Sequence, residues 1–177
     1  MHRLFVAIRP PEAVRSQLLD LMEGVKGARW QDEDQLHLTL RFIGEVDRHL
    51  ARDIAAALGS IHHPRFEIAL SGLGTFERRG QPVTLWSGVS PHEPLKALHK
   101  KVDQAVLRAG VAPDRRAYMP HITLARLARS AGPIDGLMGQ SGGLSSAPFP
   151  VEEFRLYESD VTPQGAVYSV VERYGLD

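Results

Sequence analysis

One short sequence occurs twice in the chain, and it limits the fold more than any other feature. His37-Leu38-Thr39-Leu40 recurs as His121-Ile122-Thr123-Leu124, 84 residues later and close to half the chain away. Random placement of the histidines and threonines predicts only about 0.2 His-x-Thr matches, so chance explains the pair poorly. We interpret the repeat as a sign of two similar lobes, each of which contributes one strand to a shared cleft.

Both copies have the alternating pattern of a half-buried β-strand, because residues i and i+2 of a strand point to the same face. In the first copy the predicted cleft face holds His37, Thr39 and Arg41. The opposite face is apolar and is predicted to be the core face, with Leu36, Leu38, Leu40 and Phe42. The second copy repeats the arrangement with His121 and Thr123. Each strand therefore offers one imidazole beside one hydroxyl.

The rest of the chain predicts an α+β fold with antiparallel strands and helices on their outer faces. Apolar residues at helical spacing indicate helices that begin near Pro11, Asp47 and Pro94, the last of which ends at Gly110. Strands are predicted at residues 4–8, 35–43, 65–71, 83–89, 121–127, 153–159 and 167–174. A stretch rich in Gly, Ser, Ala and Pro, residues 128–150, is predicted to be a long loop with at most one short helix. No linker divides the chain, so residues 1–177 are expected to form one bilobal domain.

The composition excludes several classes of function. The chain has no cysteine, which excludes disulfides, thiolate zinc sites and a cysteine nucleophile, and which fits a cytoplasmic protein. Lys+Arg and Asp+Glu balance at 21 each, so no global field attracts nucleic acid and any phosphate contact must be local. The apolar run at the N-terminus is too short for a signal peptide or a membrane span. No Walker-type glycine-rich loop is present, which argues against ATP-driven chemistry.

Two imidazoles and two hydroxyls, on two strands that line a shared cleft, suit the hydrolysis of a cyclic phosphodiester. That reaction needs a base to activate water and an acid to protonate the departing oxygen, and histidine performs both roles near neutral pH. Because the displacement is in-line, the two imidazoles should flank the phosphorus, while the hydroxyls stabilise the non-bridging oxygens. The competing interpretation is that both histidines are ordinary half-buried strand residues. A zinc site is a poorer fit, since no third ligand is evident from the spacing.

These segments resemble the signature segments of the two-histidine phosphoesterase superfamily, and more narrowly those of RNA 2′,3′-cyclic phosphodiesterases, often named 2′-5′ RNA ligases. The likeness covers nearly the whole chain, and it includes Leu4–Ile8, Arg29-Trp30 and Leu156–Ser159. The resemblance implies two antiparallel sheet lobes with outer helices and a central cleft. It also implies a metal-independent hydrolase that needs no cofactor and opens RNA 2′,3′-cyclic phosphate ends to a 2′-phosphate.

Roles for individual residues follow from the same resemblance. It implies that His37 is the general acid that protonates O3′ and that His121 is the general base that activates water. Thr39 and Thr123 are the implied phosphate-binding threonines. Arg126 is implied to lie near the phosphate, although strict alternation from Thr123 turns it away unless the strand ends or bulges there.

Further substrate contacts are possible on residue type alone. Two outcomes are open for Arg41: it contacts the phosphate or the next nucleotide, or it is simply solvated. Trp30 and Phe5 are candidates for stacking on a terminal base, as are Phe76 and Trp86, although such residues are more often part of a core. Two arginine pairs in polar turns, Arg78-Arg79 and Arg115-Arg116, either follow an RNA backbone or only add solubility. His62 and His63 are adjacent and would point opposite ways on an extended segment, a poor start for a shared metal site, and His92 and His99 are interpreted as surface residues.

Several alternatives stay open at this point. The substrate is either an RNA end with a 2′,3′-cyclic phosphate, a 2′,5′-linked oligonucleotide or a small cyclic nucleotide. ATP-independent 2′-5′ ligation is possible as the reverse reaction, and a non-catalytic module that binds RNA ends is the alternative from another class. The expected partner is RNA, with no membrane association and no obligate protein partner, so the protein is expected to be a monomer.

Overall fold

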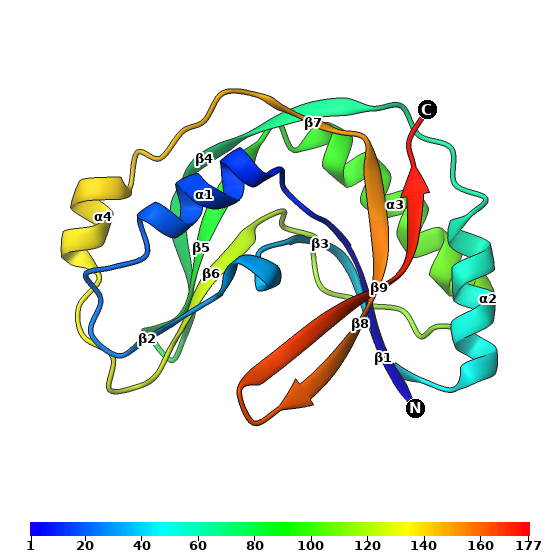
Figure 1. The fold of residues 1–177 in the computed structure, drawn as a ribbon, viewed down its shortest axis with the longest axis horizontal. Coiled ribbons are helices and arrows are strands. Elements are labelled where there is room, and N and C mark those ends of the chain that lie inside the picture. Colours follow the sequence, from blue (N-terminus) through cyan, green and yellow to red (C-terminus); the bar gives the residue numbers. More distant parts are fainter.

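Nine β-strands form one curled antiparallel sheet in the computed structural model, which describes residues 1–177 (Figure 1). The strands are β1 (His2–Ile8), β2 (Ala28–Trp30), β3 (Leu38–Val46), β4 (Phe66–Arg78), β5 (Gln81–Ser90), β6 (Ile122–Leu127), β7 (Phe149–Val151), β8 (Glu153–Thr162) and β9 (Gly165–Gly175). Their order in the sheet is β7-β4-β5-β6-β3-β1-β8-β9. The short strand β2 pairs with residues 125–127 at the C-terminal end of β6. The two strands that carry the repeated motif, β3 and β6, are therefore neighbours at the centre.

The sheet has two halves that meet at a single residue pair. One half contains β3, β1, β8 and β9, and the other contains β2, β6, β5, β4 and β7. Leu38 of β3 and Ile122 of β6 are the only paired residues between the halves. Each of them directly follows one of the two motif histidines, so the junction of the halves lies at the repeat itself.

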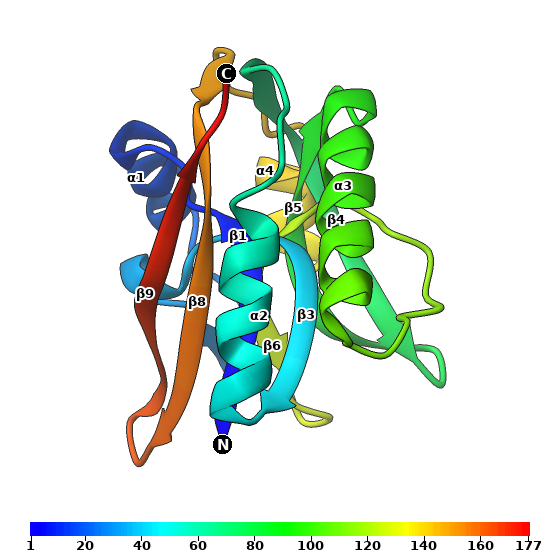
Figure 2. The same cartoon turned by 90° about the vertical axis from the view of Figure 1, so that its right-hand side faces the viewer.

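Four α-helices accompany the sheet, namely α1 (Glu12–Asp20), α2 (Arg48–Leu58), α3 (Glu93–Ala109) and α4 (Asp135–Ser141), together with the 3₁₀ helix η1 (Glu33–Gln35). Figure 2 shows α2 and α3 side by side on one face of the half that contains β1 and β3. The carboxylate of Asp47 caps α2 by accepting a hydrogen bond from the amide of Leu50 at 2.8 Å. Gly110 ends α3 in the left-handed conformation, with φ of 116°.

A hydrophobic core of 33 buried residues extends through both halves. It takes in the apolar backs of β3 and β6, including Leu38, Leu40, Ile122 and Leu124, which are at most 1% exposed. The polar residues of the motif lie on the opposite face of the same strands. The core thus holds the two motif strands in place from behind.

The α+β class and the three main helices were predicted from the sequence and are confirmed. The predicted loop at 128–150 contains one short helix, α4, as allowed, but its end forms the unpredicted strand β7. The short strand β2 was also missed, because three residues are too few for a period to be visible. None of the helices combines the length and the apolar composition that a membrane crossing requires.

Candidate active site

The two motif histidines are held in the same way. The Nδ1–H of His37 donates to the carbonyl oxygen of Gln35 at 2.7 Å, and the Nδ1–H of His121 donates to that of Met119 at 2.8 Å. A carbonyl oxygen only accepts, so each neutral ring carries its proton on Nδ1. Nε2 of each ring is therefore left with its lone pair free for an external group.

The histidines and threonines share one face of the sheet. The register that pairs Leu38 with Ile122 sets His37 opposite Thr123, and Thr39 opposite His121. We call these four residues the histidine face. No hydrogen bond within the protein occupies either threonine hydroxyl, so both are available to an anion placed between the two rings.

Aromatic rings flank each histidine from its own half of the sheet. Phe5 and Tyr168 lie beside His37, with centroid distances of 4.9 and 5.3 Å. Phe76 and Trp86 lie beside His121, at 4.9 and 6.1 Å. These rings restrict the rotation of the imidazoles and keep water away from their sides. Sequence reasoning did not identify Tyr168, because it lies on β9, 131 residues after His37.

Burial and positive charge together favour the neutral form of both rings. The pKa of His37 is lowered to about 4, chiefly by desolvation, with smaller contributions from the charges of His121 and Arg126. Desolvation is also the main cause that lowers the pKa of His121, again assisted by Arg126. The Arg126 guanidinium thus acts on both imidazoles.

A β-bulge explains how Arg126 reaches the histidine face. On β5, Trp86 pairs with Thr123 and Leu85 pairs with Ala125, so Leu124 is an extra residue on β6. The extra residue shifts the alternation by one, and Arg126 comes to lie on the side of Thr123. Its guanidinium donates to the hydroxyl of Thr84 at 3.1 Å. The bulge that the sequence argument required is therefore present.

Arg41 does not lie on the histidine face, and the prediction that it does was wrong. On β1, Ala7 pairs with Thr39 and Val6 pairs with Arg41, so Leu40 is an extra residue on β3. The shift turns Arg41 toward α3, where it is 4% exposed and donates to the carboxylate of Asp103 at 2.8 Å. A buried guanidinium with these partners holds the fold together and is not available to a substrate.

The same shift places Phe42 on the outside, although the sequence pattern assigned it to the core. Phe42 is 51% exposed. Phe5, the other aromatic candidate near the first motif, is only 3% exposed and stacks on Tyr157 at 5.1 Å. Trp30 is half-buried, pairs with Ala125 and packs against the main core. Phe5 and Trp30 are therefore both less exposed than Phe42.

At each bulge, the carbonyl oxygen of the extra leucine accepts a hydrogen bond from a residue outside the two strands that form the bulge. The oxygen of Leu40 accepts from Nδ1–H of His99 at 2.7 Å, and the oxygen of Leu124 accepts from the amide of Gln31 at 2.8 Å. His99 stacks on Tyr118 with a centroid distance of 4.0 Å, and the Tyr118 hydroxyl donates to the oxygen of Thr39 at 3.1 Å. The interpretation of His99 as a surface residue was wrong, because its ring supports β3.

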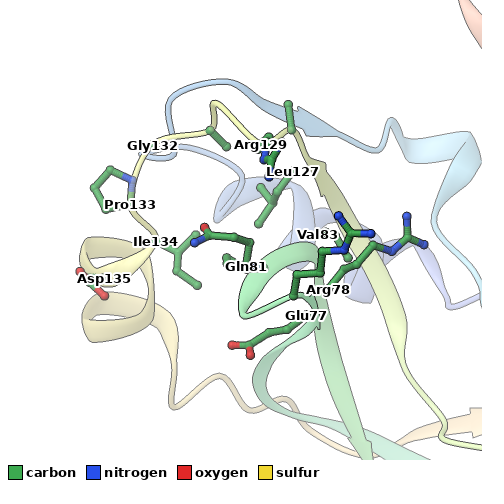
Figure 3. Close-up of a pocket in the computed structure, with 14 residues that line it drawn as sticks. Glu77, Arg78, Gln81, Val83, Leu127, Arg129, Gly132, Pro133, Ile134 and Asp135 are labelled. Carbon is green, nitrogen blue, oxygen red and sulfur yellow. The ribbon is translucent and has the colours of Figure 1, made fainter.

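A large pocket of the molecule lies away from the histidine face, and none of the four residues of that face lines it. That pocket has a volume of about 700 Å³ and lies between the β4–β5 hairpin and the segment before α4 (Figure 3). No group of three or more His, Asp or Glu side chains in the molecule is arranged to hold a metal ion. What the face offers is two free imidazole nitrogens, two hydroxyls and one guanidinium, a set that suits acid–base chemistry on a phosphate.

Two lobes of antiparallel sheet that each present a His-x-Thr strand at one junction define the two-histidine phosphoesterases. The chain belongs to the 2′-5′ RNA ligase superfamily, whose sequence model matches residues 9–163.

Relatives and solved structures agree with this membership. An RNA 2′,3′-cyclic phosphodiesterase of Aeropyrum pernix is 34% identical over 143 residues, 79% of this chain and 81% of the relative. One of Thermotoga maritima is 30% identical over 180 residues, 96% of this chain and 92% of the relative. The crystal structure of E. coli LigT in complex with 3′-AMP superposes with a TM-score of 0.80 at 27% identity, over 99% of this chain and 98% of that one.

Proposed function

We propose that the protein is a hydrolase that opens RNA 2′,3′-cyclic phosphate ends without a metal ion. The observation that carries the proposal is the pair of imidazoles on one face, each with its Nδ1–H held by a backbone carbonyl and its Nε2 free. One neutral nitrogen takes a proton and the other, once protonated, gives one. The names of the relatives and the nucleotide complex of LigT support the substrate class.

The proposed step is an in-line attack of water on the cyclic phosphate. The water oxygen bonds to phosphorus while the P–O3′ bond breaks, so the product carries a 2′-phosphate and a free 3′-hydroxyl. Nε2 of His121 takes the proton from the attacking water, and His37 gives its Nε2 proton to the departing O3′. One proton enters the pair and one leaves it, and a proton exchange with solvent then restores the starting state.

The difference in exposure supports His121 as the base. The hydrogen bond that holds His121 is exposed, whereas that of His37 is partly buried between Phe5 and Tyr168. A base that activates water benefits from access to solvent, whereas burial keeps His37 neutral in the free protein. The acid form of His37 is expected to arise on binding, because an anionic phosphate raises the pKa of a neighbouring imidazole.

The remaining members of the face bind the phosphate in this scheme. The hydroxyls of Thr39 and Thr123 donate to the non-bridging oxygens, one from each half of the sheet. Arg126 offsets the charge that builds up on those oxygens in the transition state. Its exposure and its effect on the pKa of both histidines support this role.

The test follows a short RNA with a 2′,3′-cyclic phosphate by phosphorus NMR in the presence of EDTA. Wild type is expected to convert the cyclic phosphate to a terminal 2′-phosphate. His37→Ala and His121→Ala are each expected to lower the rate by about 10²–10⁴-fold, the usual contribution of one acid–base group. His49→Ala, an exposed histidine on α2, is the matched control and should convert at the wild-type rate.

Three results would contradict the proposal. Wild type that leaves the cyclic phosphate intact lacks the activity. Loss of activity in EDTA with rescue by zinc would show that a metal ion takes part. A single histidine variant with the wild-type rate would remove the paired mechanism even if the reaction itself were observed.

The family description favours a second activity of the same site. If the 5′-hydroxyl of another RNA replaces water as the nucleophile, the same P–O3′ bond breaks and the product is a 2′,5′-phosphodiester, without ATP. Addition of an RNA with a free 5′-hydroxyl should then produce a diester signal in the NMR assay. The two histidine variants should lose ligation and hydrolysis in the same proportion, since one face performs both.

The protein is proposed to act as a monomer. Both halves of the histidine face come from one chain, and one core connects them. Sedimentation analysis at assay concentration should give the mass of a single chain, 19.6 kDa.

A further inference from the structure

Two pockets adjoin at the outer end of β6, beyond the histidine face. The inner pocket, of about 470 Å³, is lined by Gly27, Ala28, Arg29, Arg126, Leu127 and Ala128. The outer pocket is the one of about 700 Å³ in Figure 3, whose lining includes Arg78, Arg79 and Arg129. Leu127 and Ala128 belong to both pockets, so the two form one continuous surface that starts at Arg126.

The inner pocket brings two guanidinium groups together without a counter-ion. Arg29 of β2 and Arg126 of β6 are direct cross-strand partners, and both are exposed. Like charges directly opposite each other destabilise a sheet. Neither arginine has a carboxylate within 4.0 Å, although six other arginines in the protein do (Arg9, Arg15, Arg41, Arg65, Arg116 and Arg155). An anionic ligand would remove the repulsion.

The outer pocket continues the positive charge. Its three arginines, Arg78, Arg79 and Arg129, are exposed and form no ion pair within 4.0 Å. Two carboxylates also line the pocket, but Figure 3 shows Glu77 directed away from the Arg78 guanidinium and Asp135 at the opposite end, on α4. The guanidinium groups therefore dominate the end of the pocket that lies toward β6.

The hairpin that carries two of these arginines has an unfavourable residue in its turn. Arg79 and Gly80 form the two-residue loop between β4 and β5, with φ of 52° and 76°. A turn with two positive φ values favours Asn-Gly or Gly-Gly, and a long side chain at the first position is disfavoured. Such a local cost often accompanies a functional requirement, and here it places a guanidinium at the rim of the pocket.

We infer that this surface binds the backbone phosphates of the nucleotides that precede the cyclic end, so that the enzyme prefers an RNA chain to a single nucleotide. The inference rests on the proposed function. Arginines that contact phosphates give affinity without sequence preference, which suits a surface with few other polar side chains. It also agrees with a protein of zero net charge, because the positive charge is concentrated along one path that begins at the reactive phosphate.

The test compares kcat/KM for two substrates, adenosine 2′,3′-cyclic phosphate and a single-stranded hexanucleotide with the same end. Wild type is expected to prefer the hexanucleotide, and the hexanucleotide should lose more activity than the mononucleotide as salt is raised, because it makes more phosphate contacts. The triple variant Arg78→Gln/Arg79→Gln/Arg129→Gln is expected to lower kcat/KM for the hexanucleotide by about tenfold, while the slope against log salt falls by about 0.7 for each phosphate contact removed. Turnover of the mononucleotide should stay at the wild-type value.

Arg48→Gln/Arg52→Gln is the control, since these exposed arginines of α2 lie outside both pockets. It should behave like wild type on both substrates, and circular dichroism verifies that every variant is folded. Equal loss on both substrates, or no loss on the hexanucleotide, would overturn the inference while leaving the proposed function intact. Wild type without activity on either substrate would instead refute the proposed function.

Discussion

The two strands that carry the motif, β3 and β6, are built alike up to the bulge and differ after it. Each holds its histidine through the carbonyl two residues earlier, and each bulges at the leucine after the threonine. Beyond the bulge, β3 continues with Arg41 and Phe42, whereas β6 continues with Ala125 and Arg126. The position that faces the substrate is therefore apolar on one strand and cationic on the other.

This difference teaches that a repeated scaffold need not give a symmetric site. The imidazole and the hydroxyl occur twice because both protons and both non-bridging oxygens need a partner. The guanidinium occurs once at the face, and the arginine of β3, Arg41, lies one position earlier along its strand and is turned inward to hold α3. Four measurements test this asymmetry.

The largest effect on activity is expected at Arg126, which the bulge in β6 brings to the histidine face. Arg126→Gln should lower kcat/KM for cyclic phosphate hydrolysis by about 10²–10³-fold, the usual cost of removing one donor to a developing oxyanion. Phe42→Ala, at the equivalent position of β3, should cost far less, because an apolar ring does not stabilise that charge. Steady-state kinetics on the mononucleotide substrate measures both variants, and equal losses would show that the two strands contribute equally after all.

The next effect concerns stability. Asp103→Asn leaves the buried guanidinium of Arg41 without its counter-ion and should lower the free energy of unfolding by about 2–3 kcal/mol, somewhat below the cost for a fully buried pair because Asp103 is partly exposed. Urea denaturation followed by circular dichroism gives the value. Asp53→Asn, an exposed residue of α2 without an ion pair, should change little. A loss at Asp103 no greater than that at Asp53 would mean that the inward arginine is dispensable.

A smaller effect is expected from the support behind β3. Tyr118→Phe removes the hydrogen bond to the carbonyl of Thr39 and should lower stability by about 1 kcal/mol. Because Thr39 belongs to the histidine face, kcat should also fall, by about fivefold for the same energy. Tyr174→Phe loses a similar bond, to Ala55 at 2.8 Å, far from the motif. It should cost similar stability with unchanged kcat, and a parallel loss of kcat there would contradict a positioning role for Tyr118.

The smallest effect is a shift in titration. In the free protein the pKa of His37 should be about 4 and that of His121 below 6.5. Since catalysis needs one ring protonated and the other neutral, kcat/KM should be highest between these two values and fall as pH rises above the upper one. Removing the positive charge in Arg126→Gln favours protonation, so both pKa values should rise. Proton NMR of the imidazole Cε1–H signals tests this, and a downward shift would contradict it.

The sequence by itself determined the α+β class, the three main helices and the two strands that carry histidine and threonine. Periodicity carries this information, because the face that each residue presents within a regular strand or helix depends only on its neighbours in the chain. The presence of His37 and His121 in one site was also predictable, since a motif repeated at about half the chain length indicates two equivalent lobes.

Only the tertiary structure decided to which side of the sheet the residues after the threonine point in each strand. A bulge is created by pairing with a neighbouring strand, and that neighbour is distant in the sequence, β1 for Leu40 and β5 for Leu124. One unpaired residue reverses the alternation, which moved Arg41 inward and brought Phe42 and Arg126 to the outside. The contacts of Tyr168 with His37 and of Arg29 with Arg126 arise from strand pairing in the same way. The local sequence pattern thus determined which chemical groups each strand carries, and pairing with distant strands determined the side of the sheet on which those groups lie.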